Sequence, residues 1–147
     1  MLVHELSRAE CADVLGRATV GRIACVRDAH PYVVPVHIAF DGHSLYGFAT
    51  LGQKIEWMRV NPLVCVEVEE IEGSRHWTTV LAFGRYEELS KATEHQAARD
   101  RAVALLTPRG AFWLPGAAKF TGHEHGTPIL YRIAVDRMTG RRATTSE

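Results

Sequence analysis

The sequence predicts a mainly β protein, a six-stranded antiparallel β-barrel with short flanking helices. Three observations favour this class: segments rich in β-branched and apolar residues recur, turn residues separate them at hairpin distances, and short helices fall between them. The length of 147 residues suits a single domain. We expect its core to span residues 7–142, followed by a polar tail over residues 143–147.

Three short helices are expected. Ser7-Arg8-Ala9-Glu10 has the spacing of a capping box and predicts a helix that begins there. A second helix is expected over Gln53–Val60, because Asn61-Pro62 stops it. A third is expected over Ser90–Leu106, with Ser90 as its cap.

The strands are indicated by apolar alternation between turn signals. Asp41-Gly42 is a strong hairpin signal, and Gly84 predicts a bulge or crossing point in the longest strand. The polar tail that follows Asp136–Arg142 is expected to fray. The six expected strands are Thr19–Val26, Tyr32–Phe40, Ser44–Ala49, Leu63–Ile71, His76–Leu89 and Ile129–Val135.

Pro35 stands in the middle of the second expected strand. Proline has no N–H to donate to a ladder, so this strand is expected either to bulge there or to leave one backbone edge open. An open backbone edge suits a flat ligand that exchanges hydrogen bonds with the main chain.

The loop after the third expected strand has the composition of a phosphate site. It brings Thr50, Gly52, Gln53 and Lys54 close together at the start of a helix. A helix N-terminus presents free N–H groups and the positive end of its dipole, and Lys54 adds a mobile positive charge. An ordinary solvated lysine is the alternative interpretation.

Composition argues against several partners. Seventeen basic and seventeen acidic residues give a formal net charge of zero, which argues against nucleic acid or an anionic membrane as the main partner. No apolar run approaches the ~20 residues of a membrane span, and no signal peptide is visible. Three widely spaced cysteines without a C-x-x-C motif favour buried thiols over disulfides. We therefore expect a cytoplasmic protein.

The long connection over residues 107–128 invites two hypotheses. His123 and His125 have the spacing of a metal-ligand pair, but without a clear third ligand we favour polar loop residues and expect no metal site. Phe112, Trp113 and Phe120 are expected to cover the barrel or a ligand.

The order of these segments resembles the pyridoxamine 5'-phosphate oxidase-related family, in its general, nitroimidazole-resistance-like branch. The resemblance extends from about Ser7 to Arg142. Four segments carry it: G-R-I-A-C-V (Gly21–Val26), P-Y-V-V-P-V (Pro31–Val36), L-Y-G-F-A-T-L-G-Q-K to N-P-L-V-C-V-E-V (Leu45–Val68) and T-T-V-L-A-F-G-R (Thr78–Arg85).

The resemblance implies an FMN-binding split barrel in which two subunits form a homodimer with the flavin in the groove between them. Trp77 and Thr79 would lie at the dimer interface and reach the flavin of either subunit. The residues that the resemblance assigns to the cofactor are Val34, Pro35, Val36 and His37 along the isoalloxazine, Thr50, Gln53 and Lys54 at the phosphate, Trp77 and Thr79 at the flavin or its ribityl chain, and Arg22 as a further charge at the phosphate.

Two departures from the family pattern narrow the range of activities that the resemblance implies. The chain has Leu45-Tyr46-Gly47-Phe48 where nitroimidazole-resistance proteins often carry L-Y-F-H, and the last strand lacks the Arg/His motif of true pyridoxamine phosphate oxidases. We therefore expect an FMN-dependent oxidoreductase of a small substrate, with NAD(P)H as a candidate electron donor and no assigned catalytic acid. The alternatives are a non-catalytic flavin-binding or redox-sensing protein, or a barrel that uses deazaflavin F420 or haem.

Overall fold

The computed structural model describes residues 1–109 and 128–145. Its helices are α1 (Arg8–Arg17), α2 (Gln53–Val60) and α3 (Gln96–Leu106), with short 3-10 turns η1 (Thr93–His95) and η2 (Thr107–Arg109) around α3. Its strands are β1 (Leu2–Glu5), β2 (Val20–Arg27), β3 (His30–His37), β4 (Ala39–Phe40), β5 (Ser44–Ala49), β6 (Leu63–Gly73), β7 (His76–Leu89) and β8 (Ile129–Thr144).

Within the described residues, the eight strands form one antiparallel sheet. The order is β3-β2-β6-β7-β8-β5-β4, and β1 pairs with the far part of β8. The sheet curls around a core, but β3 and β4 are not hydrogen-bonded to each other, so the barrel is split rather than closed. The predicted fold class is thereby confirmed.

One predicted strand is two strands in the structure. The segment expected as Tyr32–Phe40 changes partners at Ile38, whose N–H donates to the carbonyl oxygen of Thr19 at 3.0 Å. Before this point β3 pairs with β2, and after it β4 pairs with β5. A single strand cannot follow both neighbours once the sheet curls, so the chain breaks there.

The two ends of the chain also differ from expectation. β1 was not predicted, and the last strand does not end at Val135 but continues as β8 to Thr144, into the tail that was expected to fray. β8 is held on both sides there, since Glu5 pairs with Arg141 from β1 and Thr79 pairs with the same residue from β7. Long-range pairing therefore orders a stretch whose local composition is polar.

The helix starts were predicted with mixed success. In α1, Glu10 N–H donates to Ser7 Oγ at 3.1 Å and Ser7 N–H donates to Glu10 Oε1 at 3.0 Å, which confirms the capping box. α2 has the predicted bounds. The predicted cap of α3 is wrong, because the Ser90 hydroxyl lies 2.9 Å from His95 Nδ1 and accepts from Ala92 N–H in a turn ahead of the helix.

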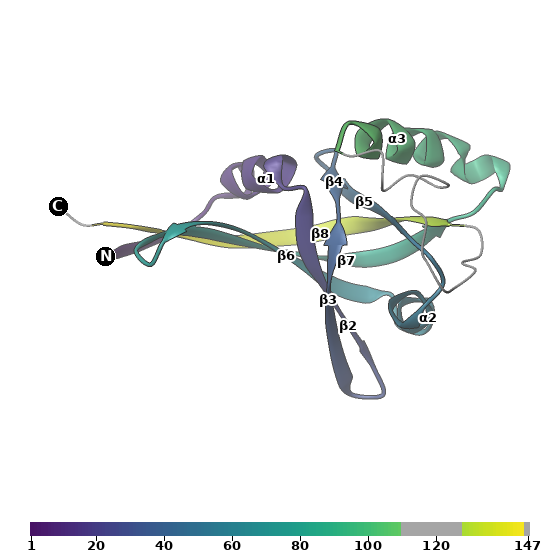
Figure 1. Cartoon of the computed structure of the whole chain (residues 1–147), viewed down its shortest axis with the longest axis horizontal. Coiled ribbons are helices and arrows are strands. Elements are labelled where there is room, and N and C mark those ends of the chain that lie inside the picture. Colours follow the sequence, from purple (N-terminus) through teal and green to yellow (C-terminus); the bar gives the residue numbers. More distant parts are fainter. Residues whose placement is uncertain (110–127, 146–147) are drawn as a thin grey trace, which may run out of the picture.

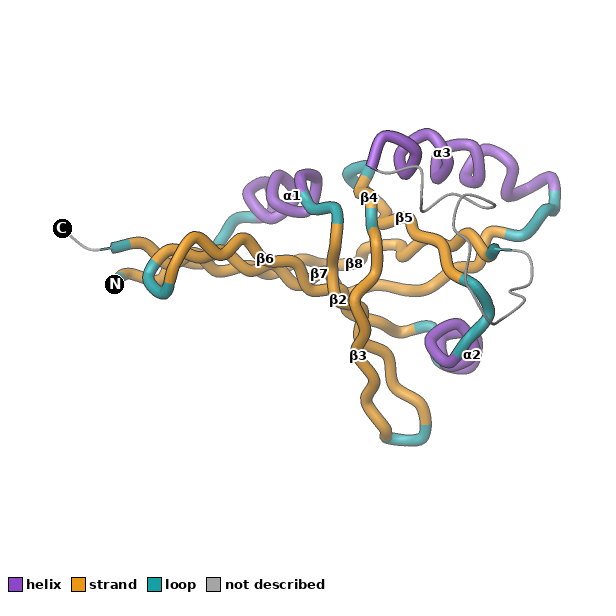
Figure 2. Tube along the Cα trace, in the orientation of Figure 1, coloured by secondary structure: helices purple, strands orange, loops and turns teal. Residues whose placement is uncertain are grey.

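Two apolar clusters hold the fold together. The larger fills the barrel and includes Cys11 and Leu15 of α1, Ile55 and Met58 of α2 and the inward side chains of the strands. The smaller lies under α3, where Leu106 packs with the strand residues Tyr46, Leu89 and Leu130. Figures 1 and 2 place α1 and α3 above the sheet and α2 beside the β2–β3 hairpin.

Two glycines allow close approach inside the sheet. A Cβ on Gly84 would lie 2.2 Å from the carbonyl oxygen of Ala134, at the point where the β7–β8 register shifts, which confirms the predicted bulge. A Cβ on Gly47 would lie 2.6 Å from the hydroxyl of Tyr131, which pairs with it across the β5–β8 ladder. Glycine at both positions is therefore a packing requirement.

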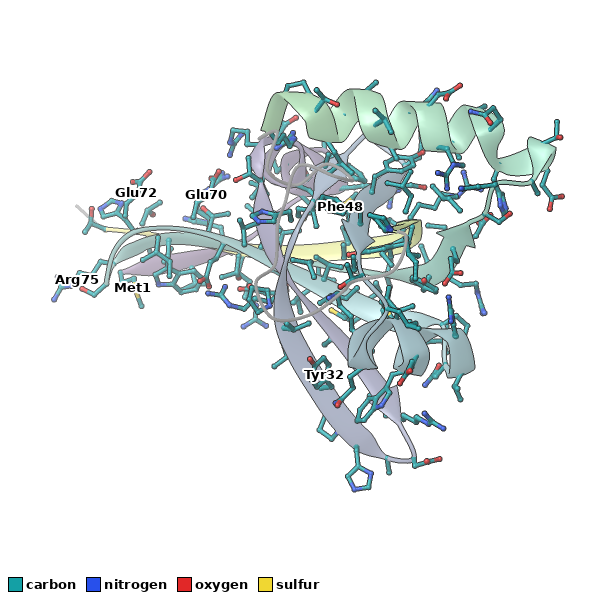
Figure 3. The ribbon with its side chains drawn as sticks, turned by 45° about the vertical axis from the view of Figure 1, so that its right-hand side comes forward. Met1, Tyr32, Phe48, Glu70, Glu72 and Arg75 are labelled. Atoms are coloured by element: carbon teal, nitrogen blue, oxygen red, sulfur yellow. The ribbon has the colours of Figure 1, made fainter. Side chains whose placement is uncertain are left out.

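Two extensions project from this body (Figure 1). One is the β2–β3 hairpin. The other is an arm built from β1, the β6–β7 hairpin and the end of β8, with Met1, Glu72 and Arg75 toward its tip in Figure 3. The arm points away from α2, so residues near its tip are remote from the start of that helix within one chain.

Candidate functional site

The site begins at the loop between β5 and α2. Gly52 is the N-cap of α2, and no side chain caps the helix there. Its φ of −170° is extended backbone open to any residue, and a Cβ would meet only the carbonyl oxygen of Thr50, at 3.9 Å. Glycine thus leaves the first-turn N–H groups of an eight-residue helix without a side-chain acceptor, as an anion site requires.

Lys54 lies in that first turn and is half-buried. It forms no ion pair within residues 1–109 and 128–145, and burial lowers the pKa of its ammonium because the charged form is desolvated. Its ammonium interacts electrostatically with the buried thiol of Cys25 in β2. The positive charge is held at the surface of the barrel core without a counter-charge.

Three arginines of the described chain are balanced by carboxylates. Arg17 binds Glu70 at 2.9 Å, Arg59 binds Glu88 at 2.8 Å and Arg132 binds Glu87 at 2.9 Å. A half-buried cation without a carboxylate partner in the described chain is suited to binding an external anion.

Helix α2 sets Lys54 beside the edge strand. Trp57, three residues further along the same helix face, packs on Tyr32 of β3 with ring centroids 5.6 Å apart. Tyr32 is paired across the β2–β3 ladder with Cys25, the neighbour of Lys54. Figure 3 shows Tyr32 on this hairpin, on the side where α2 lies.

β3 is the edge that Pro35 predicted. Within the described residues, β3 pairs only with β2, and the pairing of Pro35 with Arg22 continues without a register shift. The open edge is therefore the correct alternative and the bulge is not. No strand of the described residues pairs with the far edge of β3, which lies beside the helix that carries Lys54.

The predicted β3 residues divide between two faces. Val36 is buried in the barrel core and Val34 packs against that core, whereas Pro35 is exposed on the opposite face. His37 lies on the same face of β3 as Pro35 but is half-buried. Burial lowers the pKa of its imidazole, because the charged form is desolvated. Because these side chains alternate between the two faces, a ligand that lies along the open edge of β3 would contact the backbone of the strand.

Three predicted residues lie apart from Lys54 in a single chain. Arg22 alternates with the buried Gly21 and Ile23 and so points away from the core and from Cys25. Trp77 and Thr79 lie on the same outward face, on the arm of β7. One chain brings Thr50, Gln53 and Lys54 together at the start of α2 and leaves these three residues elsewhere.

Arg22 already has acidic partners. Its Nη1 lies 3.0 Å from Glu69 Oε1 and 3.4 Å from Glu67 Oε1. Burial and the neighbouring Glu69 raise the pKa of Glu67, while Arg22 opposes that shift. The cluster joins residues 45 and 47 positions apart in the sequence, so it depends on the register of β2 against β6.

A shallow hollow of about 340 Å³ lies beside this cluster. Its walls mix apolar and charged side chains from β2, β3, β6 and β7: Arg22, Ala24, Val33, Cys65, Glu67, Glu69 and Leu81. The hollow is on the face of the sheet opposite to Lys54.

The metal hypothesis on His123 and His125 falls outside the described residues, as do Phe112, Trp113 and Phe120. Among the described residues, no group of three or more His, Cys, Asp or Glu side chains could hold a metal ion. The helices of that part of the chain all lack the length or the hydropathy needed to cross a bilayer.

The chain is a split antiparallel barrel. Its helix α2 begins without a side-chain cap, and a lysine without a carboxylate partner in the described chain lies there, beside an edge strand. These are features of small barrels that bind ligands. The chain belongs to the pyridoxamine 5'-phosphate oxidase family, whose model matches residues 7–142. The family predicted from the sequence is thereby confirmed.

Related proteins carry the same architecture. Protein RA0666 of Rhizobium meliloti (strain 1021) is 38% identical over 150 residues, which cover 100% of this chain and 99% of that protein. The crystal structure of a FAD-binding protein from Mesorhizobium loti is 40% identical, with 99% of each chain covered and a TM-score of 0.81. The FAD binding protein from Mycobacterium smegmatis, 19% identical over 99% of this chain and 100% of that one, has a TM-score of 0.68 and supports the fold alone.

Proposed function

We propose that the chain binds a flavin nucleotide, with the phosphate at the start of α2 and the ring system along the open edge of β3. The observation that carries this proposal is Lys54, a half-buried cation without an acidic partner in the described chain, beside an uncapped helix N-terminus. Thr50 and Gln53 flank it with a hydroxyl and an amide. Together they form a donor set for a phosphate group.

FMN is the flavin that we propose, because one half-buried lysine and one helix turn match one terminal phosphate. A specific observation favours FAD as a second candidate, namely the 40% identical Mesorhizobium loti protein described as FAD-binding. Both cofactors share the flavin ring and the first phosphate. They differ in the adenylate, for which the described residues offer no assigned group.

A flavin supplies hydride-transfer chemistry when bound, so we propose an FMN-dependent oxidoreductase of a small substrate with NAD(P)H as its candidate donor. The protein's own part is to bind the phosphate, to align the ring by backbone contacts on β3 and to leave one ring face open. No described side chain is assigned as a proton donor. A flavin-binding protein without turnover is the alternative, and bleaching of the bound flavin by NADH or NADPH, with reoxidation by an acceptor, distinguishes the two.

The proposal also includes a homodimer. Trp77 and Thr79 lie on an arm that points away from α2, so they could contact a flavin only in a second subunit. Their assigned role therefore depends on the dimer.

The direct experiment is to purify the protein, record its absorption spectrum and identify the released cofactor by chromatography against FMN and FAD standards. A flavin spectrum with FMN in the extract supports the proposal, and FAD in the extract selects the second candidate. A haem or deazaflavin spectrum, or failure to bind either flavin on titration, would contradict flavin binding.

Lys54→Ala tests the phosphate contact. We expect FMN affinity to fall about 10- to 150-fold, because a charge-assisted hydrogen bond is worth roughly 1.5–3 kcal/mol. Lys91→Ala removes an exposed lysine outside this site and serves as the matched control, with unchanged affinity. Fluorescence titration measures both, and equal affinities for the two variants would reject the assignment.

A further inference from the structure

Helix α2 carries the proposed phosphate site but is too short to fix its own orientation. Its eight residues span about 12 Å, and isolated helices of this length are unstable in water. Ile55 and Met58 hold it against the barrel core, where both are fully buried. Hydrophobic contact is not directional, so this packing fixes how the helix is turned about its axis less strictly than hydrogen bonds do. The position of Lys54 therefore depends on the other contacts of α2.

Two further contacts of α2 lie on opposite sides of the helix. Trp57 packs on Tyr32 of β3, and Arg59, two residues later, lies about 200° further around the helix axis. Arg59 binds Glu88 of β7 through two hydrogen bonds, from Nε to Oε1 at 2.8 Å and from Nη2 to Oε2 at 3.0 Å. A bidentate pair of this kind constrains orientation as well as distance. The helix is thus attached to β3 by a ring contact and to β7 by a directional ion pair.

Glu88 is itself held in place from the barrel core. Tyr86 lies two positions earlier on the same face of β7 and is buried, and its hydroxyl donates to Glu88 Oε1 at 2.8 Å. Tyr86 N–H donates to the carbonyl oxygen of Pro62, just after α2, at 2.8 Å. The hydrogen bonds from Arg59 and, to a smaller extent, from Tyr86 lower the pKa of Glu88, although burial opposes them. The carboxylate therefore stays charged at neutral pH and accepts from both donors.

We propose that Glu88 and Arg59 are positioning residues of the phosphate site. Arg59 follows Lys54 on the same helix, about 7.5 Å further along its axis, so both side chains move with one rigid element. Glu88 acts through Arg59: it fixes α2 on β7, and α2 in turn places Lys54 and the N–H groups of its first turn. A binding site has to be held within about 0.5 Å of its productive geometry by groups of this kind. The inference rests on the proposed flavin binding and deepens it.

The contribution of the phosphate can be measured separately from that of the ring. Riboflavin has the ring and ribityl chain of FMN without the phosphate, so the ratio of its dissociation constant to that of FMN reports the phosphate contact alone. Glu88→Gln keeps the size of the side chain and removes its charge. We expect the ratio to fall about 3- to 10-fold, while riboflavin affinity changes less than about twofold. A general loosening of the fold would lower affinity for both ligands and would leave the ratio unchanged.

The matched control is the preceding residue on the same strand. Glu87 points to the other face of β7 and binds Arg132 of β8, again through two hydrogen bonds, at 2.9 and 3.2 Å. Glu87→Gln makes the same chemical change at an ion pair that does not involve α2, so the ratio should stay at the wild-type value. Arg59→Gln should lower the ratio as Glu88→Gln does, and the double variant should lower it no further. Fluorescence titration measures the affinities, and circular dichroism verifies that each variant is folded.

An unchanged ratio in Glu88→Gln, equal losses of FMN and riboflavin affinity, or an equal fall of the ratio in Glu87→Gln would overturn the inference. Losses that add in the double variant would show that Glu88 does not act through Arg59 and would overturn it as well. The wild type separates this inference from the proposed function. A wild type that prefers FMN, with the same preference kept in Glu88→Gln, contradicts only the positioning role. A wild type that binds riboflavin as tightly as FMN contradicts the proposed phosphate site, and one that binds neither contradicts flavin binding itself.

Discussion

Lys54 and Arg22 are two cations on opposite sides of the β2–β3 hairpin, and their surroundings are opposite. Lys54 is half-buried, lacks a carboxylate partner in the described chain and lies at an uncapped helix start. Arg22 is more exposed and is shared by Glu67 and Glu69. One region lacks an anion, and the other has more negative than positive charge.

This difference between the surroundings of Lys54 and Arg22 indicates where a ligand is expected to bind. A structural cation is balanced by the chain itself, whereas a cation kept for a ligand has its counter-charge supplied from outside. This criterion supports the proposal that the inner side binds an anionic small molecule. The outer side offers no comparable site in the described chain, because Arg22 is already paired with Glu67 and Glu69.

The largest expected effect comes from reversing each charge in turn. Lys54→Glu should lower FMN affinity by more than about 100-fold, because a favourable contact with phosphate becomes repulsion. Arg22→Glu should change FMN affinity less than about threefold, because Arg22 points away from the core and from Cys25. Flavin titration of both variants measures this, and a large loss of affinity in Arg22→Glu would place Arg22 at the phosphate after all.

A second effect is a loss of flavin affinity on the alkaline side. Burial lowers the pKa of Lys54 below its ordinary value, and a bound phosphate would raise it again by favouring the charged form. Affinity should therefore stay level below the pKa of the free site and fall by up to about tenfold per pH unit above it. Titrations in alkaline buffers should show this fall in the wild type and not in Lys54→Arg, whose guanidinium stays protonated; identical profiles would contradict the assignment.

The smallest expected effect comes from capping α2. Gly52→Ser should stabilise the helix by about a few tenths of a kcal/mol and lower FMN affinity about two- to fivefold, because the hydroxyl competes for the same N–H groups. Gly16→Ser is the matched control, since nothing lies within 4 Å of a Cβ built at Gly16. Thermal unfolding and flavin titration measure both effects, and unchanged affinity in Gly52→Ser would argue against a phosphate at the helix start.

Local sequence predicted much of the fold. β5, α2 and β7 have the predicted bounds, and the Ser7–Glu10 box caps α1, because each is governed by alternation, capping or turn residues within a few positions. The failures depend on distant partners. β1 consists of four exposed residues that pair with β8, and no short-range pattern indicates that pairing.

The site was predictable to a similar degree. Lys54 and its helix start could be identified from neighbours in the sequence, and the open edge from Pro35. The packing of Trp57 on Tyr32 and the contact of Arg22 with Glu67, 45 residues away, follow from helix docking and strand register, which alternation alone does not fix.

The contact between Gly47 and Tyr131 restricts which residues this barrel can carry at these two positions. The phenol ring occupies the room that a side chain at position 47 would need, since its oxygen lies 2.6 Å from where a Cβ would stand. Relatives with a bulky residue at position 47 are therefore expected to carry a smaller one at position 131. The residues at these two positions should vary together. Homologues with large side chains at both would need their strands spread further apart, giving a wider barrel than this one.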